Sequence, residues 1–154
     1  MQVIETKIQE LGLNIPPAPQ PVGNYKAYTV TGKLLYISGQ MPIENGDMKY
    51  KGQLGNDLSV EEGQQAAKLA ALNILSQINL CTQQTGFKFA ELIKLEGYIN
   101  ASEDFEEHAS VLNGASDLMS FVLNERAGHI RTVVGCTSLP GNAAVEISAI
   151  VALA

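Results

Sequence analysis

Charged residues make up only 17% of this chain of 154 residues, and basic residues are the scarcer kind. Ten Lys and Arg side chains stand against sixteen Asp and Glu, which gives a formal net charge of −6. The basic residues are scattered without a stripe that could neutralise a phosphate backbone, and Trp, which could stack on bases, is absent. We therefore expect no nucleic-acid partner.

Long apolar runs and cysteine motifs are also missing. No run approaches the roughly 20 apolar residues that cross a bilayer, and Met1 to Leu13 mixes Glu and Lys with apolar residues, unlike a signal peptide. Cys81 and Cys136 belong to no CxxC pair and lie at no zinc-ligand spacing. We therefore expect a soluble, cytoplasmic protein with reduced cysteines, no metal site and no membrane partner.

Apolar residues, by contrast, reach 45% of the chain. This fraction is typical of a folded domain and not of a disordered chain, and the length fits one domain. A small domain with so few charged residues has little polar surface. We therefore expect sister subunits to cover part of it.

Hydrophobic periodicity predicts the order strand, strand, helix, strand, helix, strand, strand. The first long helix follows a capping box formed by Ser59 and Glu62, and Gly86 follows its end. A minor hairpin is predicted around Met48 to Lys51. This order predicts an α+β fold in which two long helices pack on one face of a single sheet. The predicted strands are 27–31, 34–38, 92–101, 132–137 and 145–153, and the apolar positions of the second long helix span 111–123.

The N-terminal residues form a separate feature. Spaced apolar residues from Val3 to Leu11 predict a short amphipathic helix that ends at Gly12. Four Pro residues between positions 16 and 21 then require an extended connection. We therefore divide the chain into an N-terminal helix with its Pro-rich connection, residues 1–21, and one domain over residues 22–154.

Two charged residues interrupt otherwise apolar strands near the C-terminus. Arg131 opens a strand of Thr, Val, Gly and Cys, where a guanidinium needs a carboxylate or carbonyl partner. Glu146 interrupts the last strand, either as an outward polar position or as an acid/base group. From these residues alone, a structural ion pair and a ligand-binding site are both open.

Five short segments stand around these residues in a characteristic order. They are Gly23-Asn24-Tyr25, Ile37-Ser38-Gly39-Gln40-Met41-Pro42, Asp104-Phe105, Arg131, and Leu139-Pro140 followed by Val145-Glu146-Ile147. In this order and spacing they resemble the RidA/YjgF family, also called endoribonuclease L-PSP, over roughly residues 22–153. The chain is most similar to a divergent branch, because Thr132 and Val133 stand where active members usually have Ser, Ala or Cys.

The resemblance implies a chorismate mutase-like fold assembled as a homotrimeric barrel, with a cleft at each subunit boundary. Archetypal members hydrolyse reactive 2-imino acids and their enamine tautomers to 2-keto acids and ammonia, as metabolite damage control. The implied enzyme is a hydrolase of C–N bonds of the 2-iminobutanoate/2-iminopropanoate deaminase kind. Its expected partners are small 2-imino and 2-keto acids and further copies of itself, and it needs no cofactor.

The resemblance also implies roles for individual residues. Arg131 would bind the substrate carboxylate through its planar pair of donors, while Glu146 and Tyr25 would order or activate water at the imine carbon. Ser38 would either bind the ligand or serve the turn before Gly39. The residues assigned to substrate binding are Arg131, Gly39, Asn113, Ser38 and Val133.

Two other functions stay open on the sequence. The first is a binding or regulatory protein that uses the same carboxylate pocket without turnover. The second is an endoribonuclease, which the negative charge and the lack of paired catalytic His residues disfavour. His108 and His129 receive no role, and Cys136 is expected to face away from Arg131 along its strand.

Overall fold

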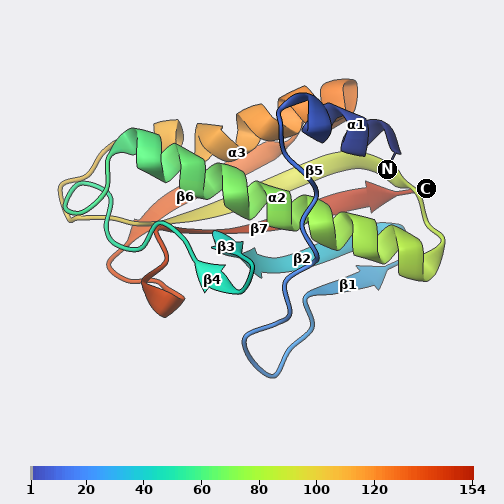
Figure 1. The fold of residues 1–154 in the computed structure, drawn as a ribbon. Coiled ribbons are helices and arrows are strands. Elements are labelled where there is room, and N and C mark those ends of the chain that lie inside the picture. The colour runs from blue at the N-terminus through green and yellow to red at the C-terminus, as the bar shows by residue number, and fades with distance from the viewer. Residues whose placement is uncertain (1) are drawn as a thin grey trace.

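Two long helices lie across one face of a five-stranded sheet in the computed structural model, which describes residues 2–154 (Figure 1). The helices are α2 (Val60–Thr85) and α3 (His108–Leu123). The strand order in the sheet is β1-β2-β7-β5-β6, and only the β5–β6 pair is parallel, because α3 crosses over between these two strands. The predicted α+β fold class and element order are therefore confirmed. The strands are β1 (Tyr28–Thr31), β2 (Leu34–Gln40), β5 (Phe89–Asn100), β6 (Ile130–Cys136) and β7 (Val145–Leu153).

Helix α2 begins and ends where its sequence signals place it. The backbone N–H of Glu62 donates to Ser59 Oγ at 3.2 Å, and the N–H of Ser59 donates to Glu62 Oε1 at 3.1 Å. At the other end Gly86 takes a left-handed φ of 78°, and its N–H donates to the carbonyl of Thr82. No helix within residues 2–154 is both long and apolar enough to span a membrane.

Helix α3 begins at His108, three residues before the first apolar position used to predict it. No side chain caps this end, so the sequence gives no start signal there. The His108 ring instead meets Phe105 edge-on, with ring centroids 5.2 Å apart. A Cβ at Gly135 would lie 2.5 Å from His108 Nε2, so the glycine on β6 makes room for this first turn.

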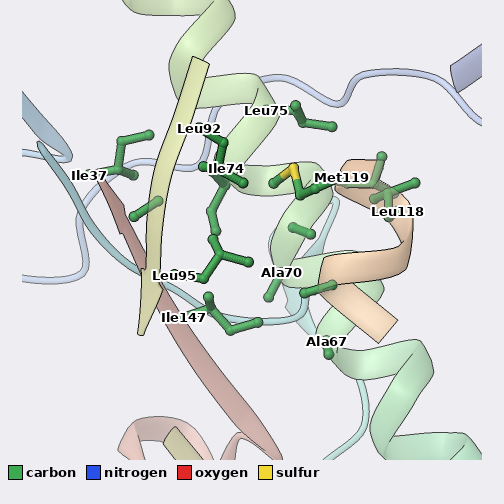
Figure 2. Close-up of a cluster of buried hydrophobic side chains, with 14 of the residues drawn as sticks. Ile37, Ala67, Ala70, Ile74, Leu75, Leu92, Leu95, Leu118, Met119 and Ile147 are labelled. Carbon is green, nitrogen blue, oxygen red and sulfur yellow. The ribbon is translucent and has the colours of Figure 1, made fainter. Parts of the chain in front are cut away.

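The core lies between the helices and one face of the sheet. Alternate residues of β7, from Val145 to Leu153, are buried toward the helices, as the period-two pattern of a strand requires. Small residues on α2, such as Ala67 and Ala70, let this helix approach both the sheet and α3 closely. Figure 2 shows how residues from three strands meet both helices, with Ile37, Leu92, Leu95 and Ile147 facing Ala70, Ile74, Leu118 and Met119.

The opposite face of the sheet is apolar but uncovered within one chain. Its exposed positions include Ile130 and Val134 of β6, which are 67% and 45% exposed, together with Leu34, Tyr36 and Tyr98. Tyr98 is paired with Val134 and with Glu146 in the strand register. A face of this kind usually belongs to an interface between subunits.

The N-terminal segment packs on the helices. Helix α1 (Gln2–Glu10) lies on α3, burying Ile4 and Ile8, and Lys7 Nζ lies 5.3 Å from the centroid of the Phe121 ring. The Pro-rich segment then runs over α2, where Gln77 Nε2 donates to the carbonyl of Pro19 at 3.0 Å. The division of the chain at residue 21 stays a prediction.

The minor hairpin lies earlier than predicted. Its strands are β3 (Ile43–Glu44) and β4 (Asp47–Met48), and Asn45 and Gly46 both have positive φ between them. This is the geometry that an Asn-Gly pair favours in a two-residue turn. The prediction of a hairpin around Met48 to Lys51 was therefore wrong, and Lys51 forms an isolated bridge to Ala143 instead.

The close crossing of α2 and α3 gives a stability prediction. A Cβ at Gly114 would collide with the backbone of Gln64, lying 2.8 Å from its Cα and pressing on its carbonyl oxygen. Because backbone cannot move aside as a side chain can, Gly114→Ala should destabilise the fold by about 2 kcal/mol, measured by urea denaturation. Gly128→Ala is the matched control, because nothing lies within 4 Å of that position. Equal stability of the two variants would contradict the packing described here.

Candidate active site in two halves

The first group of predicted site residues gathers where β2 ends and β7 begins. The register between these strands is interrupted between Ile37 and Gln40, and Gly39 lies in that irregular stretch. A Cβ on Gly39 would lie 2.8 Å from both Cγ and Cδ of Glu146. Only a glycine therefore lets the Glu146 side chain occupy this place, which gives Gly39 a physical reason to accompany it.

Glu146 is a half-buried carboxylate without a partner in the described chain. Neither a hydrogen bond nor an ion pair joins it to any of residues 2–154, where the ion pairs are Lys7 with Glu10 and Lys94 with Glu96. Burial raises the pKa of Glu146 above its usual value, because the charged form loses solvation. A carboxylate with a raised pKa and free lone pairs takes up a proton more readily than an exposed carboxylate and can return it.

Tyr25 and Ser38 lie next to Gly39. Tyr25 is 49% exposed, and together with Ala27 and Gly39 it lines a small depression under the Pro-rich segment. Ser38 Oγ donates to the carbonyl of Lys26 at 2.7 Å, and the Ser38 N–H donates to the carbonyl of Ala27. The Ser38 hydroxyl proton thus ties the segment that carries Tyr25 to β2, which matches the turn role left open by the sequence.

Arg131 stands on the other side of the molecule, on the edge strand β6. It is paired in register with buried Leu95, so its side chain leaves the sheet on the face that the helices cover. Its Nη1 donates to Ser116 Oγ at 3.0 Å, and its Nη2 donates to the carbonyl of Ala109 at 3.2 Å. No carboxylate of residues 2–154 lies within 4.0 Å of it. An intrachain ion pair between Arg131 and Glu146 is therefore excluded.

Asn113 and Val133 accompany Arg131. Ala109, Asn113 and Ser116 are spaced by four and three residues, so they share one side of α3 and Asn113 stands between the two contacts of Arg131. Asn113 is exposed. Val133 lies two residues beyond Arg131 on the same side of β6 and packs against the core. The group therefore combines a cation, an amide and an apolar wall.

One chain does not bring the two groups together. Strand β5 separates β6 from β7 (Figure 1). The strand register places Arg131 and Glu146 on opposite faces of the sheet. Cys136 is paired in register with Asn100 and lies an odd number of positions from Arg131 along β6, so the prediction that Cys136 faces away from Arg131 is confirmed. The Glu146 half-site is Tyr25, Ser38, Gly39 and Glu146, and the Arg131 half-site is Arg131, Asn113 and Val133.

Two further residues belong to the Arg131 half-site. His129 Nε2 lies 2.9 Å from Ser116 Oγ, and His129 Nδ1 lies 2.6 Å from the carbonyl oxygen of Ala127. The sequence signal for His129 was its place two residues before Arg131, immediately before β6 begins at Ile130. Ser116 carries no signal of its own, because a single Ser inside a helix is most often a surface residue.

Comparison with known proteins defines the family. A family profile described as "YjgF/chorismate mutase-like, putative endoribonuclease" matches residues 5–152. The chain is 39% identical to Protein TCP17 of Trypanosoma cruzi over 151 residues, which cover 97% of this chain and 94% of that protein. The crystal structure of Atu1372 from Agrobacterium tumefaciens covers 99% of this chain, and 94% of Atu1372, with 42% identity and a TM-score of 0.90.

A more distant relative has a described activity. The chain is 27% identical over 143 residues to the 2-iminobutanoate/2-iminopropanoate deaminase of Dermatophagoides farinae, covering 92% of this chain and 94% of that protein. Together these matches show that the chain belongs to the RidA/YjgF family, as its motifs predicted. The matches also include most of the N-terminal segment, which the motif resemblance did not reach.

The closeness of Cys136 to Glu146 can be tested in solution. Burial and, secondarily, the charge of Glu146 raise the pKa of the Cys136 thiol. Glu146→Gln removes that charge, so the thiol pKa should fall and the thiolate fraction at a given pH should rise. The pH profile of alkylation by iodoacetamide, followed by mass spectrometry, should therefore move to lower pH. Fully buried Cys81 is the internal control and should stay unmodified; an unchanged Cys136 profile would contradict the geometry.

Proposed function

We propose that this protein hydrolyses 2-imino acids and their 2-enamine tautomers to 2-keto acids and ammonia, in a cleft formed by two copies of the chain. The observation that carries the proposal is that Arg131 and Glu146 each lack, within the described residues of one chain, the partner that their charge requires. Arg131 has no carboxylate partner, and Glu146 has a raised pKa and neither a hydrogen-bond nor an ion-pair partner among residues 2–154. The relationship to a 2-iminobutanoate/2-iminopropanoate deaminase supports this reaction class.

The Arg131 half-site is suited to the invariant part of such substrates, the carboxylate. A guanidinium has five N–H donors, of which the contacts with Ser116 and Ala109 use two. The remaining donors can bind a carboxylate as a planar pair, and the Asn113 amide stands beside them. Val133 supplies an apolar surface for a short side chain. These features favour a small 2-imino acid over a neutral amine or a large ligand.

The Glu146 half-site is suited to adding water to the imine carbon. An iminium is already electrophilic, so the protein has to supply a proton acceptor and hold the water. Glu146 would take a proton as the water oxygen bonds to the carbon, and the Tyr25 hydroxyl would hold that water in place. Glu146 then returns the proton to the amino group of the carbinolamine. As the C–N bond breaks, the carbinolamine hydroxyl loses its proton to form the carbonyl of the 2-keto acid, and the departing ammonia takes up that proton, so the balance is one iminium and one water in, one ketone and one ammonium out.

We also propose that the protein is a homotrimer, the assembly that the family resemblance implies. The exposed apolar face, with Tyr36, Tyr98, Ile130 and Val134, needs cover, and the two half-sites need each other. Light scattering should therefore give three times the chain mass at micromolar concentration. A stable monomer would leave the apolar face exposed and the two half-sites apart, and it would contradict the proposed cleft.

The roles of Arg131 and Glu146 can be separated by two conservative substitutions. Arg131→Lys keeps the charge but loses the planar pair of donors, so binding and turnover should both weaken by about 2 kcal/mol. Glu146→Gln keeps the shape but loses the base, so affinity for 2-oxobutanoate should survive while turnover falls about a hundredfold or more. Turnover is measured with an amino-acid oxidase that supplies the imine and semicarbazide that traps it. Affinity is measured by calorimetric titration.

The same assay decides between enzyme and binder. Wild-type protein in catalytic amounts should lower the yield of trapped imine far below the uncatalysed control. Binding of 2-oxobutanoate without any effect on trapping would replace the deaminase with a carboxylate-binding protein. Loss of folding in both variants, with unchanged activity per folded molecule, would reject the assigned roles.

A further inference from the structure

A chain of hydrogen bonds runs from the guanidinium of Arg131 to the end of the short helix before β6. Arg131 Nη1 donates to Ser116 Oγ, which lies 2.9 Å from His129 Nε2, and His129 Nδ1 lies 2.6 Å from the carbonyl oxygen of Ala127. Ala127 is the last residue of η1 (Asn124–Ala127), where a carbonyl has no helical partner. The His129 ring therefore satisfies this helix end and contacts Ser116 at the same time.

The direction of each bond follows from the chemistry of the groups. A carbonyl oxygen only accepts, so Nδ1 carries the proton, and in the neutral ring Nε2 is left as an acceptor. The Ser116 hydroxyl must then donate to Nε2. This turns its lone pairs toward Arg131, whose Nη1 can only donate. His129 thus fixes the rotation of the Ser116 hydroxyl, and Ser116 in turn fixes the guanidinium.

We propose that Ser116 and His129 are positioning residues, which hold the Arg131 guanidinium in the orientation that binds the substrate carboxylate. This inference rests on the proposed function, because it assigns the ligand of Arg131. An Arg side chain on an edge strand samples many rotamers, and fixing them on binding costs affinity. Bonds from Nη1 to Ser116 and from Nη2 to Ala109 fix the plane before the ligand arrives, while three of the five N–H groups remain for it.

The contact of His129 with Ala127 serves the end of η1, but a structural role does not explain the contacts of Ser116 with Arg131 and His129. Ser116 and His129 are both partly exposed at the rim of the molecule, and neither belongs to the buried cluster between the helices and the sheet. Their loss should therefore change the orientation of Arg131 far more than the stability of the fold. Because His129 touches Arg131 only through Ser116, the two residues should also act as a unit.

The test compares affinity for 2-oxobutanoate, by calorimetry, across five variants. Ser116→Ala and His129→Phe should each weaken binding about fivefold, the scale of one lost hydrogen bond, whereas Ser116→Thr keeps the hydroxyl and should bind like wild type. The double variant Ser116→Ala with His129→Phe should be no weaker than Ser116→Ala alone. Ser120→Ala, an exposed Ser one turn further along α3, is the control and should leave affinity unchanged.

Kinetics give a second readout that separates positioning from chemistry. The loss in the Ser116 and His129 variants should fall on KM, with kcat close to that of wild type, because Glu146 and Tyr25 are untouched. Additive losses in the double variant, or wild-type affinity in both single variants, would overturn the positioning assignment while leaving the deaminase proposal intact.

A measurement on the protein without ligand distinguishes failure of the proposed function from failure of the positioning assignment. Nitrogen-15 NMR of the neutral His129 ring should show the proton on Nδ1, and Ser116→Ala should perturb the Nε2 resonance. If wild type binds no 2-keto acid while this tautomer is present, the proposed function is overturned and the hydrogen-bonded chain stands. A proton on Nε2 in the neutral ring would overturn the chain itself.

Discussion

The alternation of side chains along β-strands separates the two charged residues of the candidate site, Arg131 and Glu146. Arg131 leaves the sheet on the helix side, and Glu146 leaves it on the bare side, with β5 between their strands. No rotamer change can bring the two together in one chain, because the sheet itself stands between them. Within residues 2–154, Arg131 therefore lacks a carboxylate partner, and Glu146 lacks a hydrogen-bond or ion-pair partner. We propose that a second copy of the chain completes the site.

Neighbouring residues hold Glu146 and Arg131 in their places on the two faces of the sheet. Gly39 lacks a side chain where any Cβ would displace Glu146, and Ser38 anchors the segment that carries Tyr25. At the far edge of the sheet, the close crossing of α2 and α3 at Gly114 holds α3 in the place from which Ser116 and Ala109 accept hydrogen bonds from Arg131. The apolar strand face between the half-sites includes the exposed Tyr98 and Val134, and it is the surface on which we propose that copies of the chain meet.

Much of the fold could be predicted because local signals and the global structure agree. The capping box at Ser59 and the alternation along β7 each fix an element by chemistry that acts within a few residues. The start of α3 could not be predicted, because no capping side chain marks it. The hairpin was misplaced because the Asn45-Gly46 turn was overlooked. For the candidate site, motif order predicted Arg131 and Glu146, and these assignments stay predictions, while periodicity did not show that the two residues face opposite sides of the sheet. The contact between Ser116 and His129 depends on how α3 lies over β6, which no local pattern encodes.

The central claim is that catalysis uses Arg131 of one subunit and Glu146 of another. Mixing two inactive proteins, Arg131→Ala and Glu146→Gln, under conditions that exchange subunits tests it directly. In randomly assembled trimers from equal amounts, about a quarter of the clefts would combine a native Glu146 with a native Arg131, so imine-hydrolysing activity should return to about a quarter of the wild-type value. Each variant alone should stay near its residual rate. Exchange that is verified by mass spectrometry but restores no activity would contradict the account.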